Sequence, residues 1–281
     1  MIDIVTVVFR EELPVLKLQA ESISLYCRHM CLHTIYVVIN DDNVDPSEID
    51  VGWWGRFSDR VVVIPRQTWN IDYAENGWLT QQLLKLLAAE QSKSEWSMVL
   101  DAKTIIVQPV ELDRLFDDNG RLTWGYCPVF PVFERAKQLV SELFQIELTS
   151  VAGPAGIPFF FHNQTVKNMI REVTQLTKQP FDRWFQATGM ITEFILYSGY
   201  IQYRDGTLDK MYTNTFDRPY QLCNICHGET AVFDQKFLDM LDDNNLTVSI
   251  HRGAWAHLTE SQRNKYKNLL ISRGITGATE L

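Results

Sequence analysis

The sequence predicts an α/β fold with a mainly parallel sheet flanked by helices. In its first half, short apolar runs alternate with longer segments of helical periodicity. The opening run, residues 2–9, ends as a continuous apolar stretch, as in a strand buried on both faces. Strands that alternate with helices pair in parallel through right-handed crossovers. The length of 281 residues suits a single domain, and no linker interrupts it.

The first half yields the clearest elements. Pro14 is tolerated in the first turn of a helix, and Pro65 closes a strand. A polar turn then carries Asp101 between two apolar runs. We expect strands over 2–9, 35–39, 61–64, 97–100 and 104–107, and helices over 12–30 and 77–91.

The second half is less regular. Thr192 is a suitable N-cap for a helix, and Thr259 with Gln262 forms a capping box for a final helix. The apolar pattern predicts strands over 122–126, 159–162 and 248–251, and helices over 135–148, 164–177, from 193 onward and over 260–272.

The composition excludes several classes of protein. A net charge of −9 argues against general nucleic-acid binding. No apolar run approaches the roughly 20 residues that span a bilayer, and the N-terminus lacks the basic region of a signal peptide. We therefore expect a cytoplasmic protein without a transmembrane segment. Five cysteines with scattered spacing argue against a disulfide framework.

Polar residues follow each predicted strand of the first half. They are Phe9-Arg10, Asn40-Asp41-Asp42, Pro65-Arg66 and Asp101-Ala102-Lys103. Ligands of open parallel sheets bind beyond the carboxyl ends of the strands, so these positions predict a site. Turns also favour Asp and Asn, which leaves a purely structural interpretation open.

The order of five segments resembles the GT-A-type glycosyltransferases, in particular an uncharacterised group of bacterial and phage glycosyltransferase-like proteins. The segments are DIVTV at 3–7, VVIND at 37–41, GWLTQQLLKL at 77–86, VLDAK at 99–103 and TEFILY at 192–197. The resemblance implies a GT-A-like, Rossmann-type sheet, with a nucleotide-sugar-binding half at 1–108 and a less regular acceptor-side half at 109–281. It also implies transfer of a sugar, of hexosyltransferase type, from a nucleotide-sugar donor.

The acid motif departs from the family pattern. That pattern is Asp-x-Asp, in which the first acid contacts the ribose or a metal and the last binds Mn²⁺ or Mg²⁺. Here Asp101 stands first and Lys103 last. A charged lysine cannot ligate a metal, but it can lie against phosphate. We therefore expect metal-independent or weakly metal-dependent chemistry, while Asp101 with His251 is the pair that the resemblance offers for a metal.

Further roles follow from the resemblance. Glu193 is the predicted general base for the acceptor hydroxyl, although an acid at a helix start is also favoured by the helix dipole. Asp101 is the second predicted catalytic residue. The predicted substrate-binding residues are Thr6, Phe9, Arg10, Asn40, Asp41, Arg66, Gln81, Gln82, Lys85, Lys103, His162 and Trp184. His162 and Trp184 are equally typical of a core.

Alternatives remain at this stage. The acceptor could be a glycan, a lipid-linked saccharide or a protein, and loss of the second acid would also suit a non-catalytic nucleotide- or sugar-binding protein. Residues 223–227 read C-x-x-C-H, which is a haem or zinc pattern or a coincidence. The first strand is not followed by a glycine-rich loop, which disfavours a nucleotidyltransferase or a dinucleotide oxidoreductase.

Overall fold

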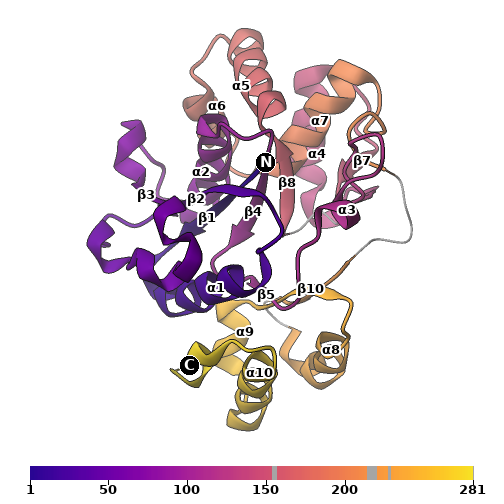
Figure 1. Ribbon diagram of the computed structural model, residues 1–281. Coiled ribbons are helices and arrows are strands. Elements are labelled where there is room, and N and C mark those ends of the chain that lie inside the picture. Colours follow the sequence, from indigo (N-terminus) through magenta and orange to yellow (C-terminus); the bar gives the residue numbers. More distant parts are fainter. Residues whose placement is uncertain (154–156, 214–219, 227–228, 281) are drawn as a thin grey trace.

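The computed structural model describes residues 1–153, 157–213, 220–226 and 229–280 (Figure 1). Its centre is a five-stranded sheet in the order β3-β2-β1-β4-β8, in which the first four strands are parallel and β8 is antiparallel to β4. The strands are β1 Ile2–Val8, β2 Leu32–Ile39, β3 Val61–Pro65, β4 Trp96–Asp101 and β8 Phe159–His162.

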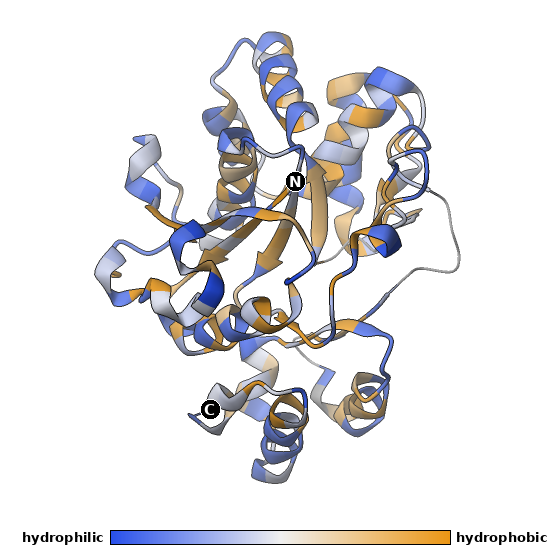
Figure 2. Cartoon of the chain, in the orientation of Figure 1, coloured by the Kyte–Doolittle hydropathy of each residue, from blue (hydrophilic) through white to orange (hydrophobic). Residues whose placement is uncertain are grey.

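Helices flank this sheet, and buried apolar residues form the core between them. Figure 2 shows that the strands of the sheet are largely hydrophobic. α2 packs against β1 and against α5, α6 and α7, whereas α1 packs against a 3-10 segment and β5. The helices are α1 Leu13–Tyr26, α2 Gly77–Gln91, α3 Leu112–Leu115, α4 Glu134–Phe144, α5 Asn163–Thr177, α6 Phe181–Ala187 and α7 Glu193–Asp205. Short 3-10 helices are η1 Arg10–Glu12, η2 Pro46–Glu48, η3 Val51–Arg60, η4 Arg66–Trp69, η5 Pro131–Phe133, η6 Glu229–Val232 and η7 Thr276–Glu280.

A second sheet joins the C-terminal segment to the first half of the chain. β10 is parallel to β9 and antiparallel to β5, which directly follows the Asp101 turn. A second apolar cluster lies between this sheet, α1 and the C-terminal helices. Its elements are β5 Ile105–Ile106, β9 Gln221–Ile225, β10 Asn245–Ile250, α8 Phe233–Met240, α9 Arg252–His257 and α10 Glu260–Ser272; a separate hairpin pairs β6 Tyr126–Pro128 with β7 Ser150–Ala152.

The predicted fold class is confirmed, and most elements lie where the sequence predicts them. α2 and α10 have the expected bounds, and the Thr259–Gln262 capping box is present. No helix of the described residues is long and apolar enough to cross a membrane.

Five predicted elements differ from the structure by three residues or more. The strand expected over 35–39 begins at Leu32, and the strand expected over 248–251 begins at Asn245. The strand expected over 122–126 is interrupted by a turn at 123–124, Gly125 has a φ of 72°, and β6 begins only at Tyr126. The helix expected over 135–148 ends at Phe144, where Gln145 adopts a left-handed conformation. The helix expected over 12–30 stops at Tyr26.

Gly199 in α7 allows close packing against α4. A Cβ at this position would lie 2.1 Å from Cγ1 of the buried Val140. We expect Gly199→Ala to lower the free energy of unfolding by roughly 1–3 kcal/mol, as overpacked cores do. Urea unfolding measures this, with the exposed α4 variant Gln138→Ala as the control. Equal stability of both variants would contradict this packing.

Candidate functional site

A cavity of about 590 Å³ lies beyond the carboxyl ends of β1 and β4, and it is hereafter called the donor cavity. The ends of β9 and β10 and the start of α2 complete it. Its lining is Phe9, Glu12, Gly77, Trp78, Gln81, Gln82, Asp101, Lys103, Thr104, Phe133, Ile157, Asn224, Ile225, Cys226, Ser249, His251 and Arg252.

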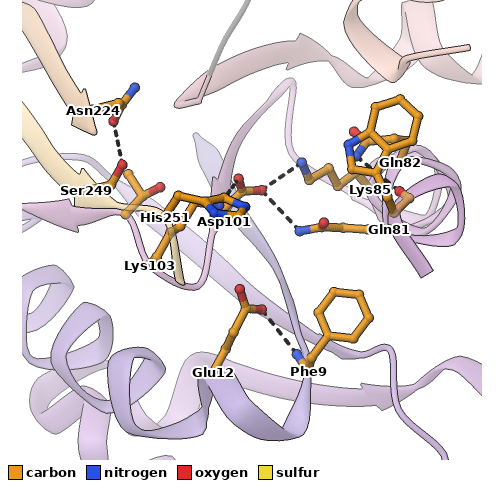
Figure 3. A network of polar contacts seen from close by, with 12 residues as sticks. Phe9, Glu12, Gln81, Gln82, Lys85, Asp101, Lys103, Asn224, Ser249 and His251 are labelled. Atoms are coloured by element: carbon orange, nitrogen blue, oxygen red, sulfur yellow. Dashed lines mark hydrogen bonds and ion pairs between the residues drawn. The ribbon is translucent and has the colours of Figure 1, made fainter. Parts of the chain in front are cut away.

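Asp101 makes polar contacts with three side chains at this cavity. Its Oδ1 lies 2.8 Å from Nζ of Lys85 and accepts a hydrogen bond from Gln81 at 3.2 Å. Its Oδ2 lies 2.7 Å from Nζ of Lys103. Figure 3 shows Lys85 and Gln81 reaching Asp101 from α2. Burial raises the pKa of Asp101, but the two lysines outweigh it and hold this pKa well below its usual range.

Lys85 lies in the protein interior, where its ammonium group has two carboxylate partners. The side chain is 3% exposed, and Nζ lies 3.1 Å from Oε1 of Glu193, which is 1% exposed. Burial lowers the pKa of Lys85, yet Asp101 and Glu193 together raise it above its ordinary value. Burial raises the pKa of Glu193, and Lys85 offsets only part of that rise. Lys85 therefore stays charged inside the fold.

The turn that carries Lys103 is held by Gln19 of α1, a residue that the sequence interpretation did not single out. Thr104 donates its backbone N–H to the Asp101 carbonyl at 2.8 Å, which closes the turn. The buried Gln19 of α1 donates to the carbonyls of Asp101 at 2.6 Å and Thr104 at 3.0 Å. Lys103 itself is 21% exposed and faces the donor cavity.

Glu12 is a second residue that the sequence interpretation missed, since it was assigned to the first turn of a helix. It lines the donor cavity, is 9% exposed and accepts a hydrogen bond from the backbone N–H of Phe9 at 3.4 Å. Burial raises the pKa of its carboxyl, and Lys103 offsets part of the rise. The sequence signal that could have indicated Glu12 is its position three residues after the predicted strand over 2–9.

Several predicted residues converge here and others do not. Phe9, Gln81, Gln82, Asp101 and Lys103 line the donor cavity together with His251, while Lys85 lies directly behind Asp101. The residues after β1, β2 and β3 instead form their own polar cluster. Its contacts join Arg66 with Asp42 and Asn40, and Arg10 with Glu48, Asn43 and Asp41.

The remaining predicted residues lie outside the lining of the donor cavity. Thr6 is fully buried in β1. The ring of His162 packs 5.3 Å from that of Trp96, and its Nδ1 lies 2.9 Å from the Thr165 hydroxyl. Trp184 packs against Phe181 in α6. Their substrate contacts stay predictions, as does the role of Glu193 as a base. The Glu193 side chain is 1% exposed, and its carboxylate lies 3.1 Å from Nζ of Lys85.

The residues around Asp101 do not fit a divalent cation. Lys85 and Lys103 already occupy its two oxygens, and His251 uses Nδ1 to accept the backbone N–H of Gly253 at 3.1 Å. Within the described ranges, no group of three His, Cys, Asp or Glu side chains could hold a metal. Cys223 is buried and Cys226 lines the cavity, whereas His227 of the C-x-x-C-H pattern lies outside the described residues.

The family of the chain follows from its sequence. Residues 6–248 match the model of a family described as "Family of unknown function (DUF6492)", and this match spans most of the chain, from within β1 to within β10. The chain belongs to this family. A search of curated proteins finds no match.

Solved structures with a distant likeness to this DUF6492 member include three glycosyltransferases. The galactosyltransferase LgtC, in complex with donor and acceptor sugar analogs, is 12% identical, with a TM-score of 0.47 over 96% of this chain and 95% of LgtC. GlyE from Streptococcus pneumoniae TIGR4 is 11% identical, with a TM-score of 0.48 over 99% of this chain and 62% of GlyE. The bifunctional glycosyltransferase WbbM is 10% identical, with a TM-score of 0.49 over 96% of this chain and 49% of WbbM.

Removing the Lys85 ammonium leaves Glu193 buried without its counter-ion. We expect Lys85→Met to lower the free energy of unfolding by roughly 3–5 kcal/mol at neutral pH. Because the variant raises the folded-state pKa of Glu193 further, its deficit grows as pH rises above the ordinary glutamate value near 4.5. Urea unfolding across this pH range measures it.

The double variant Lys85→Met/Glu193→Gln provides the control. It removes the uncompensated carboxylate, so it is expected to recover part of the loss and to flatten the pH dependence. If the loss of unfolding free energy in the double variant equals the sum of the losses in the two single variants, Lys85 and Glu193 are not coupled.

Proposed function

We propose that this protein transfers a sugar, of hexosyl type, from a nucleotide-sugar donor to a hydroxyl-bearing acceptor. The observation that carries this proposal is the Asp101 carboxylate at the end of β4, held by Lys85 and Lys103 at a cavity of about 590 Å³. A cavity of that size, at the carboxyl ends of parallel strands, suits a ligand as large as a nucleotide sugar. The resemblance of the sequence to GT-A-type glycosyltransferases points to the same chemistry.

The transfer requires stabilisation of charge on the leaving group. The acceptor oxygen forms a bond to the anomeric carbon while the bond from that carbon to the phosphate oxygen breaks. The nucleoside diphosphate leaves with the bonding electrons, and the carboxylate of Glu12, which lines the donor cavity, takes the hydroxyl proton. Lys103 and Arg252 line the cavity and supply positive charge for the diphosphate.

Lys85 and Glu193 serve this site indirectly in the proposal. Both side chains are buried, and Lys85 bridges Glu193 to Asp101. A fixed positive charge behind Asp101 keeps its carboxylate ionised and oriented toward the donor. Gln81 and Gln82 line the same wall and present amides that suit the hydroxyls of a sugar or ribose.

The proposal assigns residues 1–108 to the donor side and residues 109–281 to the acceptor side. Asp101 and Lys103 come from the first part, whereas Asn224, Ser249 and His251 close the cavity from the second. We further propose that the reaction needs no divalent metal, because two ammonium groups occupy the carboxylate that would bind one.

A non-catalytic nucleotide-binding protein is the second candidate. It is favoured by the Lys103 ammonium, which stays bound to Asp101 at 2.7 Å and closes off its outer oxygen. Turnover of a donor separates the two candidates, because both predict nucleotide binding and only the enzyme releases nucleoside diphosphate.

Lys103→Ala tests the cationic role of the turn. We expect it to weaken the binding of nucleoside diphosphates by about tenfold to a hundredfold, through loss of a charge-assisted contact. Calorimetric titration with several nucleoside diphosphates measures this. Lys17→Ala is the control, since Lys17 forms a surface ion pair with Glu280 and does not line the donor cavity. Equal affinity of both variants would remove Lys103 from the site.

Chelation tests metal independence. We expect release of nucleoside diphosphate from a hydrolysed or transferred donor to continue in excess chelator. Lys103→Asp, which restores an Asp-x-Asp sequence, is the matched variant, and we expect its turnover to depend on added Mn²⁺. Wild-type turnover that stops with chelator and returns with manganese would contradict the lysine-based mechanism.

A further inference from the structure

A second cavity, of about 330 Å³, lies beside the donor cavity and is hereafter called the side cavity. Glu12, Lys103 and Arg252 line both cavities, so they form a shared wall. The side cavity takes its lining residues mainly from α1, β5, β10 and the C-terminal helices, and Figure 1 shows α1 above these helices. Its lining is Glu11, Glu12, Pro14, Val15, Leu18, Lys103, Ile105, Ile250, Arg252, Trp255, Tyr266 and Glu280.

Apolar side chains form the walls of the side cavity. Leu18 of α1, Ile105 of β5 and Ile250 of β10 are buried members of the second apolar cluster. Trp255 and Tyr266 meet edge to face, with ring centroids 6.0 Å apart. Such walls suit an aliphatic or aromatic group and offer few partners for the hydroxyls of a glycan.

The charges at the rim favour an uncharged occupant. Three carboxylates line the cavity, those of Glu11, Glu12 and Glu280, together with the two cations Lys103 and Arg252, and Glu280 is already paired with Lys17 at 2.7 Å. Each cation already has an acidic neighbour, because Lys103 lies 2.7 Å from Asp101 and Arg252 lies 3.7 Å from Glu11. In the proposed enzyme Lys103 and Arg252 face the donor diphosphate, so a phosphate in the side cavity would meet the carboxylates of Glu11 and Glu12 without an excess of positive charge.

We propose that the side cavity binds the uncharged apolar body of the acceptor, a small aliphatic or aromatic group that carries a hydroxyl. This inference rests on the proposed glycosyl transfer. The buried Glu12 carboxyl on the shared wall accepts a hydrogen bond from that hydroxyl and directs it toward the donor cavity. The substrate class is thus an apolar alcohol or phenol rather than a glycan or a phosphate-linked lipid.

The matched probes 2-naphthol and 2-naphthyl phosphate test this assignment, since they share one aromatic body and differ in charge. Calorimetric titration of the full chain is expected to show binding of the naphthol and at least about tenfold weaker binding of the phosphate. Val15→Phe, which fills the cavity from α1, is expected to weaken naphthol binding by about tenfold or more. Val62→Phe is the control, because Val62 is exposed on β3 and lines neither cavity.

A second variant and a competition experiment complete the test. Trp255→Ala removes the aromatic face and is expected to weaken naphthol binding even if Val15→Phe does not fold. Saturating nucleoside diphosphate is expected to leave naphthol binding in place. Three results would contradict the proposal. Displacement of the naphthol by the nucleotide would assign the cavity to the donor, and tighter binding of the naphthyl phosphate would assign it to a phosphate-linked lipid. Equal naphthol binding by all variants would show that the side cavity is not the binding site.

Failure of the proposed function gives a different result. If the protein transfers no sugar, no nucleoside diphosphate is released from the donor, while naphthol binding and its sensitivity to Val15→Phe persist. If only the acceptor assignment fails, donor turnover persists and naphthol neither binds nor accepts a sugar.

Discussion

The site depends on one buried ammonium group. Lys85 of α2 lies between Asp101 at the end of β4 and Glu193 at the start of α7, so a single side chain joins three elements. An unpaired ammonium in that position would cost several kcal/mol in desolvation. Its two carboxylates offset this cost only while α2, β4 and α7 keep their present arrangement. The geometry of Asp101 is therefore a property of the packed core rather than of its turn.

The contacts of Lys85 with Asp101 and Glu193 also explain how Lys103 can stand where the Asp-x-Asp pattern has its second acid. Asp101 and Glu193 contribute two carboxylates, and Lys85 and Lys103 contribute two ammonium groups, so their formal charges cancel. With an aspartate at 103, an extra anion would face the cavity and would need a metal ion as its counter-charge. A lysine there gives the site its own cation on a side chain that is still partly exposed. In the proposed enzyme, that cation takes the place of the metal at the diphosphate.

Local patterns in the sequence predicted the strands of the sheet but not the side-chain contacts between distant elements. Continuous apolar strands and helical periodicity sufficed for β1 to β4 and for α2, because both reflect burial along a single element. The contact between Lys85 and Glu193 spans 108 residues, and no local pattern encodes such a distance. The sequence did not indicate Glu12 and Gln19 for a related reason. Each looks like an ordinary helical residue, and its role depends on the packing of α1 against the Asp101 turn. The strand expected over 122–126 failed because Gly125 adopts a positive φ there.

The sequence predicted β10 and α10 of the C-terminal segment but not β9, α8 or α9, and this segment limits where Lys103 can lie. Immediately after Lys103 and Thr104 the chain enters β5, which pairs with β10 rather than with the central sheet. The turn is therefore held on one side by β4 and on the other by the C-terminal sheet, with Gln19 bonded to both of its ends. Because α9 and α10 follow β10, the element that fixes the lysine turn also brings Trp255 and Tyr266 over α1. A change in the packing of these helices would thus alter the wall shared by the two cavities, and with it the approach of any acceptor to the donor.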